Sequence, residues 1–421
     1  MNGISNDFQY QLMQEKLEIL NNVFSPSSPI KKKDLFFGRI DQIAKIQSTL
    51  FENGQHIALY GERGVGKTSM ANIANEFFSN IASSKVTCNR NDKFNSLWHQ
   101  ALKNITYTTT NDQNTIGYLP NEKTTTFCLK DLLPNIEDLS SSDIVNVLTR
   151  FSDKMLFIFD EYDSITDKEV KSKMADILKS LSDNCSNITI MIVGIGKDVV
   201  ELIGEHQSLQ RCIRQIKMPR MSEDELLQII NNGYSILGLS IDPIVSNKII
   251  EFSVGFPNFT HLLAKYAAES AIFENSNLIN LANFNKAVNK SLENSFEDLS
   301  NDFHQATMSS KGKSKFEDIL FSAAKVVVDE YDCFFVRDIP LAYHNLTKKQ
   351  IERHNVTYYL KQLCSDDRKK IIEKIGSNTA NTKYRLRNPM MKAFIRLRLF
   401  NKQEKEKLVK SDALFRPQKS Y

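Results

Sequence analysis

The stretch QHIALYGERGVGKTSM, residues 55–70, decides the fold that we expect for this chain. Its centre, residues 61–68, fits the pattern G-x-x-x-x-G-K-[ST] of a phosphate-binding loop. The apolar run at residues 57–60 predicts a buried strand that enters the loop, and residues 68–78 predict a helix that leaves it. A chance glycine-rich loop is the alternative. The order of strand, loop and helix favours phosphate binding.

The chemistry of such a loop depends on its backbone. Glycines let successive N–H groups point inward at phosphate oxygens, and the following helix adds its positive N-terminus. Lys67 would reach the β- and γ-phosphates, and the Thr68 hydroxyl would bind Mg²⁺. We therefore predict nucleotide contacts along one continuous set of residues: Gly61, Glu62, Arg63, Gly64, Val65, Gly66, Lys67, Thr68 and Ser69.

A second motif follows the apolar run MLFIF, residues 155–159. A continuous run of this kind is typical of a central parallel strand that is buried on both faces. It ends in Asp160 and Glu161, and we expect Asp160 to hold Mg²⁺ and Glu161 to polarise the attacking water as general base. An acidic pair after a strand can instead cap a helix, but its place downstream of a phosphate-binding loop favours the catalytic interpretation.

Composition describes an ordinary globular protein. The chain has 421 residues, of which 41% are hydrophobic and 25% charged, and this length predicts two or three domains. Its apolar runs are too short for a membrane span, and its N-terminus lacks the pattern of a secretory signal, so we expect a cytoplasmic protein without a membrane partner. Scattered cysteines predict reduced thiols: Cys88, Cys128, Cys185, Cys212, Cys333 and Cys364.

Charge is distributed unevenly along the chain. Residues 301–421 carry 25 Lys and Arg against 14 Asp and Glu, a net charge of +11. Residues 1–300 carry 29 against 36, a net charge of −7. A basic C-terminal third indicates a polyanion partner, and a solvated basic surface is an equally good explanation of charge alone.

Hydrophobic periodicity divides the chain into five segments. Residues 1–29 predict a helix and a linker, and residues 30–220 predict strands that alternate with helices in a parallel, doubly wound sheet. Within this α/β core, residues 106–123 are polar and predict a surface loop. A capping box from Ser222 to Glu225 opens an all-helical lid at 221–300. Residues 301–400 predict a winged-helix domain, and 401–421 a basic tail.

The winged-helix prediction depends on the order of the elements. Helices are expected at 315–328, 347–354 and 356–363, with a short extended piece at 336–340. Two strands, at 370–376 and 383–388, would form the wing, and a helix at 389–399 would follow them.

Two arginines near the predicted fifth strand are candidates for action across a subunit boundary. Arg211, with Arg214 as second choice, would stabilise charge on the γ-phosphate of a neighbouring subunit. A surface salt bridge is the alternative for either residue.

These features together resemble one family. Residues 35–39 (LFFGR), the phosphate-binding loop, residues 155–163, 193–198 and 218–226, the lid and the winged helix resemble the AAA+ ATPases of the origin-recognition type, the initiator and helicase-loader clade, in a bacterial-looking form. The resemblance implies an α/β P-loop AAA+ core, a helical lid and a DNA-binding winged helix. It also implies ATP as substrate, Mg²⁺ as cofactor, and assembly as a homo-oligomer.

The resemblance adds three site residues. The segment before the first strand often lines the adenine pocket of such ATPases, which implies Phe37 and Arg39, although simple packing would also explain them. A polar side chain at the end of the fourth strand commonly contacts the γ-phosphate, which implies Lys197.

Two departures from the family pattern favour a slow switch. The family often has Asn where Lys197 stands, and its lid usually carries Gly-x-x-Arg where this chain has Gly255-Phe256-Pro257-Asn258. The Gly-x-Pro form looks like the lid of signal-transduction ATPases.

Two hypotheses of function follow. In the first, an ATP-hydrolysing AAA+ protein contacts double-stranded DNA through its winged helix. In the second, the ATPase is a regulatory switch for a protein effector, in an anti-phage or mobile-element module, and the winged helix docks that protein. The candidate phosphate contacts for the first hypothesis are Arg368, Lys369, Lys370, Lys383, Arg385 and Arg387.

Overall fold

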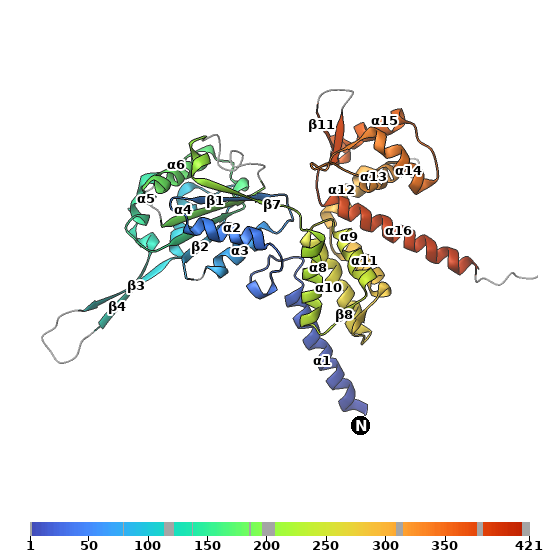
Figure 1. Cartoon of the computed structure of the whole chain (residues 1–421), viewed down its shortest axis with the longest axis horizontal. Coiled ribbons are helices and arrows are strands. Elements are labelled where there is room, and N and C mark those ends of the chain that lie inside the picture. Colours follow the sequence, from blue (N-terminus) through green and yellow to red (C-terminus); the bar gives the residue numbers. More distant parts are fainter. Residues whose placement is uncertain are drawn as a thin grey trace, which may run out of the picture. The chain divides into compact units, whose positions relative to one another are not determined.

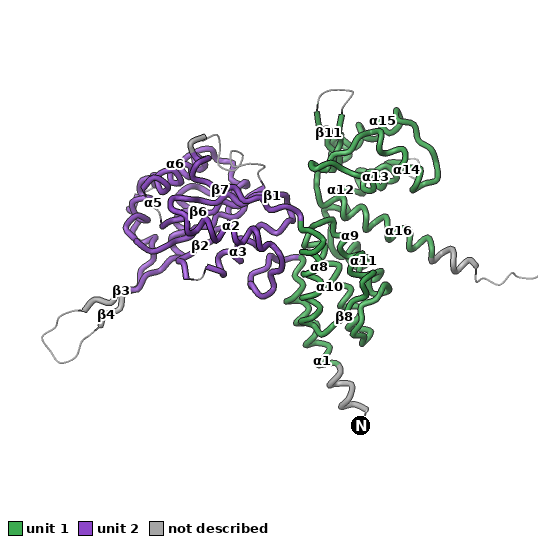
Figure 2. The backbone as a smooth tube through the Cα atoms, viewed as in Figure 1, with its two compact units in different colours: residues 1–26, 221–421 green, residues 27–220 purple. Residues whose placement is uncertain are grey.

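The computed structural model describes residues 2–78, 80–112, 122–136, 138–184, 187–195, 207–308, 315–376 and 382–414. They form two compact units (Figure 2): residues 27–220, which we call the α/β unit, and residues 1–26 with 221–421, which we call the helical unit. None of the helices in the described ranges combines the length and apolar character that a membrane span requires.

The α/β unit is built on a five-stranded parallel sheet with the order β2-β5-β6-β1-β7 (Figure 1). Every residue of β5 and β6 is buried, as their continuous apolar runs predict. The strands are β1 (His56–Gly61), β2 (Ala82–Thr87), β5 (Met155–Asp160), β6 (Ile188–Gly194) and β7 (Ile213–Met218). The helices of this unit are η1 (Lys33–Leu35), α2 (Ile40–Phe51), α3 (Lys67–Phe77), α4 (Phe94–Lys103), η2 (Leu129–Leu132), α5 (Ser141–Leu148), η3 (Tyr162–Ser164), α6 (Lys168–Asn184) and η4 (Gln207–Arg211).

An aromatic cluster fixes β5, the strand that carries the acidic motif. Trp98 on α4 is fully buried, with its ring centroid 5.6 Å from that of Phe157 and 5.3 Å from that of Phe159. Such edge-on and tilted ring pairs hold their partners in a defined orientation. The packing therefore positions the carboxyl end of β5, where Asp160 is the last residue.

The predicted surface loop at residues 106–123 is wrong in part. Strands β3 (Thr106–Asp112) and β4 (Glu122–Cys128) pair antiparallel in a hairpin that is separate from the five-stranded sheet (Figure 1). Threonine is polar, but its branched side chain favours strands, and a polarity criterion overlooks this preference. Tyr107 anchors the base of the hairpin, because its ring stacks on Phe127 and Phe151.

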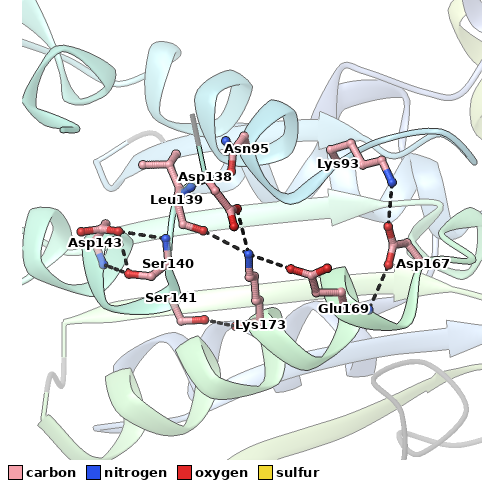
Figure 3. A network of polar contacts seen from close by, with 10 residues as sticks. All are labelled: Lys93, Asn95, Asp138, Leu139, Ser140, Ser141, Asp143, Asp167, Glu169 and Lys173. Carbon is pink, nitrogen blue, oxygen red and sulfur yellow. Dashed lines mark hydrogen bonds and ion pairs between the residues drawn. The ribbon is translucent and has the colours of Figure 1, made fainter. Parts of the chain in front are cut away.

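A polar network joins helices α4, α5 and α6 (Figure 3). Lys173 Nζ on α6 lies 3.0 Å from Asp138 Oδ1 and 2.9 Å from Glu169 Oε1. Both carboxylates are largely exposed, so these ion pairs orient α6 and contribute little to stability. Asn95 accepts a hydrogen bond from the Leu139 backbone N–H, which ties the entry of α5 to α4.

The helical unit begins with α1 (Asn2–Val23), which packs on α10. Phe24 is fully buried, and Gly233 on α8 makes room for it: a Cβ there would lie 2.4 Å from the Phe24 ring. The capping box at the start of α8 is confirmed, with the Ser222 side chain accepting from the Glu225 N–H. The unit continues with α8 (Glu223–Ile236), β8 (Ser240–Ile241), α9 (Pro243–Ser253), α10 (Pro257–Phe273), β9 (Leu278–Ile279), α11 (Leu281–Asn294) and α12 (Glu297–Thr307).

The C-terminal elements of this unit differ from the prediction in three places. The predicted extended piece at 336–340 and helix at 347–354 are wrong: η5 leads into α14, where Pro340 fits the first turn and Lys348 ends the helix with a φ of 61°. A third short strand, β10, pairs with β12. The predicted tail boundary at 401 is also wrong, because α16 continues through it. The elements are α13 (Lys315–Lys325), β10 (Phe334–Phe335), η5 (Val336–Asp338), α14 (Ile339–Thr347), α15 (Arg353–Leu363), η6 (Asp366–Arg368), β11 (Ile372–Ile375), β12 (Lys383–Leu386) and α16 (Met391–Leu414).

Candidate nucleotide-binding site

The phosphate-binding loop leaves the carboxyl end of β1 and enters α3. Gly61 lies so close to β7 that a Cβ on it would be 2.4 Å from the Met218 carbonyl oxygen. Gly64 and Gly66 have φ values of 87° and 95°, a region that glycine enters without strain. Gly61 therefore lets the loop pass close to β7, and Gly64 and Gly66 let the chain turn from the loop into α3.

Lys67 is the first residue of α3, and its side chain folds back over the loop. Its ammonium donates to the backbone oxygens of Gly61 (3.0 Å) and Glu62 (2.8 Å). Burial lowers the pKa of Lys67 from its ordinary value, while the carboxylates of Asp163 and Asp160 act in the opposite direction. A desolvated ammonium whose two acceptors among the described residues are neutral carbonyls is well prepared to turn toward a phosphate.

The two sequence motifs meet in space. Thr68 Oγ1 donates to Asp160 Oδ1 over 3.4 Å, although β6 lies between β1 and β5 in the sheet. Asp160 is buried, and its Oδ1 also accepts from the Glu161 N–H. Glu161 is exposed and has a φ of 56°, so the chain turns sharply where the strand ends. The Glu161 side chain therefore lies at the surface, next in sequence to the buried aspartate.

This donor set fits a magnesium ion. A threonine hydroxyl and an aspartate oxygen are hard ligands, and Mg²⁺ is usually bound by one or two carboxylates together with substrate phosphates and water. Thr68 and Asp160 would hold the ion, as the sequence predicts. Asp163 has a different task, because its Oδ1 accepts from the Ile195 N–H and ties η3 to the end of β6.

Arg39 is a buried residue that holds the phosphate-binding loop in place. Its side chain is 1% exposed, and Nη2 donates to the carbonyl oxygens of Val65 (3.0 Å) and Pro219 (2.7 Å). These bonds connect the loop to the end of β7 and give Arg39 a positioning role. Contact of Arg39, or of half-buried Phe37, with an adenine base stays a prediction.

Further contacts restrain both ends of the loop. Arg220 Nε donates to Glu62 Oε2 over 2.8 Å, an interaction that sequence reasoning missed. The Ser69 hydroxyl accepts from the Ile30 N–H, so this side chain anchors the preceding segment to α3. Arg63 is exposed and Val65 is buried.

Among the remaining predicted site residues, Arg211 and Arg214 are described by the structure. Lys197 lies outside the described residues. Arg211 forms an ion pair with Asp183 (2.8 Å), and Arg214 forms one with Glu52 (2.8 Å). Gln55 donates to the Arg211 carbonyl at the amino end of β1, so the length of that strand separates Arg211 from the phosphate-binding loop of the same chain. A role for either arginine in another subunit stays a prediction.

Lys85 is a site residue that sequence reasoning missed. Its ammonium lies 2.9 Å from Asp160 Oδ2 and donates to Asn72 Oδ1 over 2.6 Å. The available signal was a lone lysine inside the strand ASSKVT, since charged residues are rarely placed there without a partner.

Comparisons with known proteins concern the fold and the family. No curated protein matches the chain in sequence. The chain is similar in structure to the Walker-type ATPase paby2304 of Pyrococcus abyssi, with a TM-score of 0.52 and 15% identity over 89% of this chain and 99% of that one. It is also similar to the Orc1 protein of Aeropyrum pernix, solved in complex with DNA (TM-score 0.45, 14% identity, 89% and 95% covered). A third similar structure is Cdc6p of Pyrobaculum aerophilum (TM-score 0.44, 14% identity, 91% and 98% covered).

The first of these likenesses confirms the α/β P-loop fold and, at this identity, concerns the fold alone. The family model for Novel STAND NTPase 1 matches residues 29–327. This range includes the loop, the acidic motif and the helices up to α13. It covers well over half of the chain, and the protein therefore belongs to the nSTAND1 family of NTPases.

Proposed function

We propose that this protein binds ATP with Mg²⁺ and hydrolyses it slowly as a conformational switch. The observation that carries the proposal is the meeting of Thr68 and Asp160, 3.4 Å apart, beside the half-buried ammonium of Lys67. Two motifs far apart in sequence supply phosphate and metal ligands at one edge of the sheet. The family match to an NTPase supports the same substrate class.

Each residue has a separate role in this proposal. The loop N–H groups and Lys67 bind the phosphates, and Thr68 and Asp160 hold the metal. Mg²⁺, when bound, neutralises charge on the β- and γ-phosphate oxygens. Glu161 accepts the proton of the attacking water, and it is the exposed carboxylate that follows the buried Asp160. Arg211 completes the charge stabilisation from a neighbouring subunit.

The first test compares the wild type with Glu161→Gln by light scattering, with and without ATP and Mg²⁺. We expect ATP to increase the particle mass of both proteins, and Glu161→Gln to hold the larger mass because it cannot hydrolyse the ATP between subunits. Hydrolysis should fall by roughly a hundredfold or more, the usual effect of losing a general base. Glu169→Gln, which changes an exposed carboxylate on α6, serves as the control.

A constant mass with bound nucleotide would contradict the role of Arg211 across subunits. The protein would then be a nucleotide-gated module that acts on a different partner, such as a protein effector. Absence of nucleotide binding would contradict the proposed function itself.

Contact with double-stranded DNA is a second candidate, supported by the net charge of +11 over residues 301–421. Several of the proposed phosphate contacts already have partners. Lys383 pairs with Asp329 (2.7 Å), Arg385 with Glu373 and Lys370 with Asp366 (2.8 Å). The Arg368 guanidinium donates to the carbonyls of Ala306 and Met308.

Lys369 and Arg387 differ from these cations. Both are exposed, and no side-chain bond to either is seen in the part of the chain that the structure describes. We therefore expect Lys369→Ala with Arg387→Ala to lower DNA affinity and to reduce the slope of log affinity against log salt by roughly 0.9 for each lost phosphate contact. Lys383→Ala with Arg385→Ala should change the slope less. Equal slopes for all three proteins would remove these residues from the interface.

A further inference from the structure

Lys85 occupies an unusual position beside the proposed metal site. Strands β2 and β5 run parallel, and Lys85 pairs in register with Ile158. Side chains two residues apart share a face of a strand, so Lys85 and Asp160 point to the same side of the sheet. The long lysine side chain covers that offset, and its ammonium ends 2.9 Å from Asp160 Oδ2.

The ammonium is held in place from a second direction. Asn72 lies one helical turn after Thr68 on α3, and its Oδ1 accepts from Lys85 Nζ over 2.6 Å. The orientation of the Asn72 amide is fixed in turn, because its Nδ2 donates to the Ile30 carbonyl over 3.1 Å. The Lys85 side chain is 17% exposed and that of Asp160 only 2%, so solvent competes weakly for this contact.

The two oxygens of Asp160 therefore face different partners. Oδ1 lies on the side of Thr68 and the phosphate-binding loop, where it accepts from the Thr68 hydroxyl and the Glu161 N–H. Oδ2 faces Lys85 on the outer strand. A metal ion that binds Thr68 and Oδ1 can enter without displacing the lysine.

We propose that the Lys85 ammonium is a permanent part of the metal site. It balances the negative charge of Asp160 whether or not a metal ion is bound, and nucleotide binding therefore depends only weakly on Mg²⁺. This inference depends on the nucleotide-binding function proposed above. It assigns to Lys85 a positioning and charge-setting role, since its ammonium contacts the metal ligand and the phosphate-binding helix.

The expected effect follows from the charges around the site. Asp160, Glu161 and Asp163 are acidic, and Lys67 and Lys85 oppose them. Without Lys85, the site is one charge more negative, so it repels metal-free nucleotide and attracts Mg²⁺ more strongly. Charges a few ångströms apart in a partly buried site interact strongly enough to change binding by roughly tenfold or more.

The test measures the affinity of a fluorescent ADP analogue in Mg²⁺ and in EDTA, and compares the ratio between variants. We expect a small ratio for the wild type and a ratio larger by roughly tenfold or more for Lys85→Met. Lys85→Arg, which keeps the charge, should return the ratio toward the wild-type value. Lys173→Met is the matched control, because it removes an ion-paired lysine of the same unit far from the loop in sequence and should leave the ratio unchanged.

Equal ratios for Lys85→Met and the wild type would overturn the inference and leave nucleotide binding intact. A wild-type protein that binds no nucleotide in either buffer would overturn the proposed function instead. If Lys85→Met does not fold, Lys85→Gln carries the same test, because its amide retains a hydrogen bond to Asn72 without the charge. A wild-type ratio as large as that of the neutral variants would also contradict the role of Lys85.

Discussion

Lys67→Ala is expected to lower nucleotide affinity by roughly a hundredfold or more without weakening the fold. The lost ammonium would contact two phosphates, and charge-assisted bonds of this kind contribute about 3 kcal/mol or more together, which corresponds to roughly a hundredfold in affinity. The unloaded protein gains little from Lys67. Burial lowers the pKa of its ammonium in the folded state, which disfavours the charged form at neutral pH, and water can reach the half-buried carbonyls of Gly61 and Glu62 that it leaves, so its removal should cost little stability.

Thermal unfolding with and without ATP and Mg²⁺ measures both effects together. The wild type should unfold at a higher temperature when nucleotide is present, since a ligand of the folded state stabilises it by mass action. Lys67→Ala should show the unloaded melting temperature in both conditions. An unchanged nucleotide shift in this variant would mean that phosphate binds elsewhere.

Arg39→Ala is expected to lower the stability of the unloaded protein, which Lys67→Ala should not change. The change leaves the buried carbonyl of Val65 without its donor, at a cost of about 1–3 kcal/mol, whereas water can reach the carbonyl of exposed Pro219; it also removes the packing of a fully buried side chain. A total of about 3 kcal/mol lowers the melting temperature of a unit of this size by roughly 6–12 °C. Nucleotide affinity should fall as well, because the loop loses its tie to β7.

Chemical denaturation of the unloaded protein separates the two variants. Arg39→Ala should unfold at a lower denaturant concentration than the wild type, and Lys67→Ala should not. Arg214→Ala is the matched control, since its ion pair with Glu52 is substantially exposed and should contribute less than about 1 kcal/mol. Full stability together with lost binding in Arg39→Ala would instead support the prediction that Arg39 contacts the nucleotide.

The central strands β5 and β6 were predictable because burial on both faces favours a continuous apolar run, which is visible in the sequence. A strand covered on both faces is expected to be largely apolar, and β5 and β6 are, with Asp160 and Thr189 as their polar residues. The β3–β4 hairpin leaves no such trace, because it is stabilised by strand pairing and by the stacking of Tyr107 at its base. The boundaries of α14 were missed because Pro340 can either extend a chain or begin a helix.

The site was predictable where ligand chemistry fixes both residue type and spacing. The meeting of Thr68 with Asp160 is of this kind. Arg39 and Lys85 were harder to assign, because each acts through a partner distant in sequence: Pro219 for the first, Asn72 and Asp160 for the second. A prediction from local pattern identifies groups that touch a ligand more readily than groups that hold those residues in place.

The burial of Phe24 against Gly233 has a consequence for synthesis on the ribosome. The helical unit is discontinuous in sequence, since residues 1–26 join residues 221–421. At ordinary translation rates, roughly 10–40 s pass between the emergence of α1 and that of its partners α8 and α10. During that interval the entire α/β unit can emerge and fold, while the Phe24 ring has no site to enter. The nascent chain thus carries the unpaired apolar end of α1, with Leu20, Val23 and Phe24, for about half of its synthesis, a natural point of contact for a chaperone.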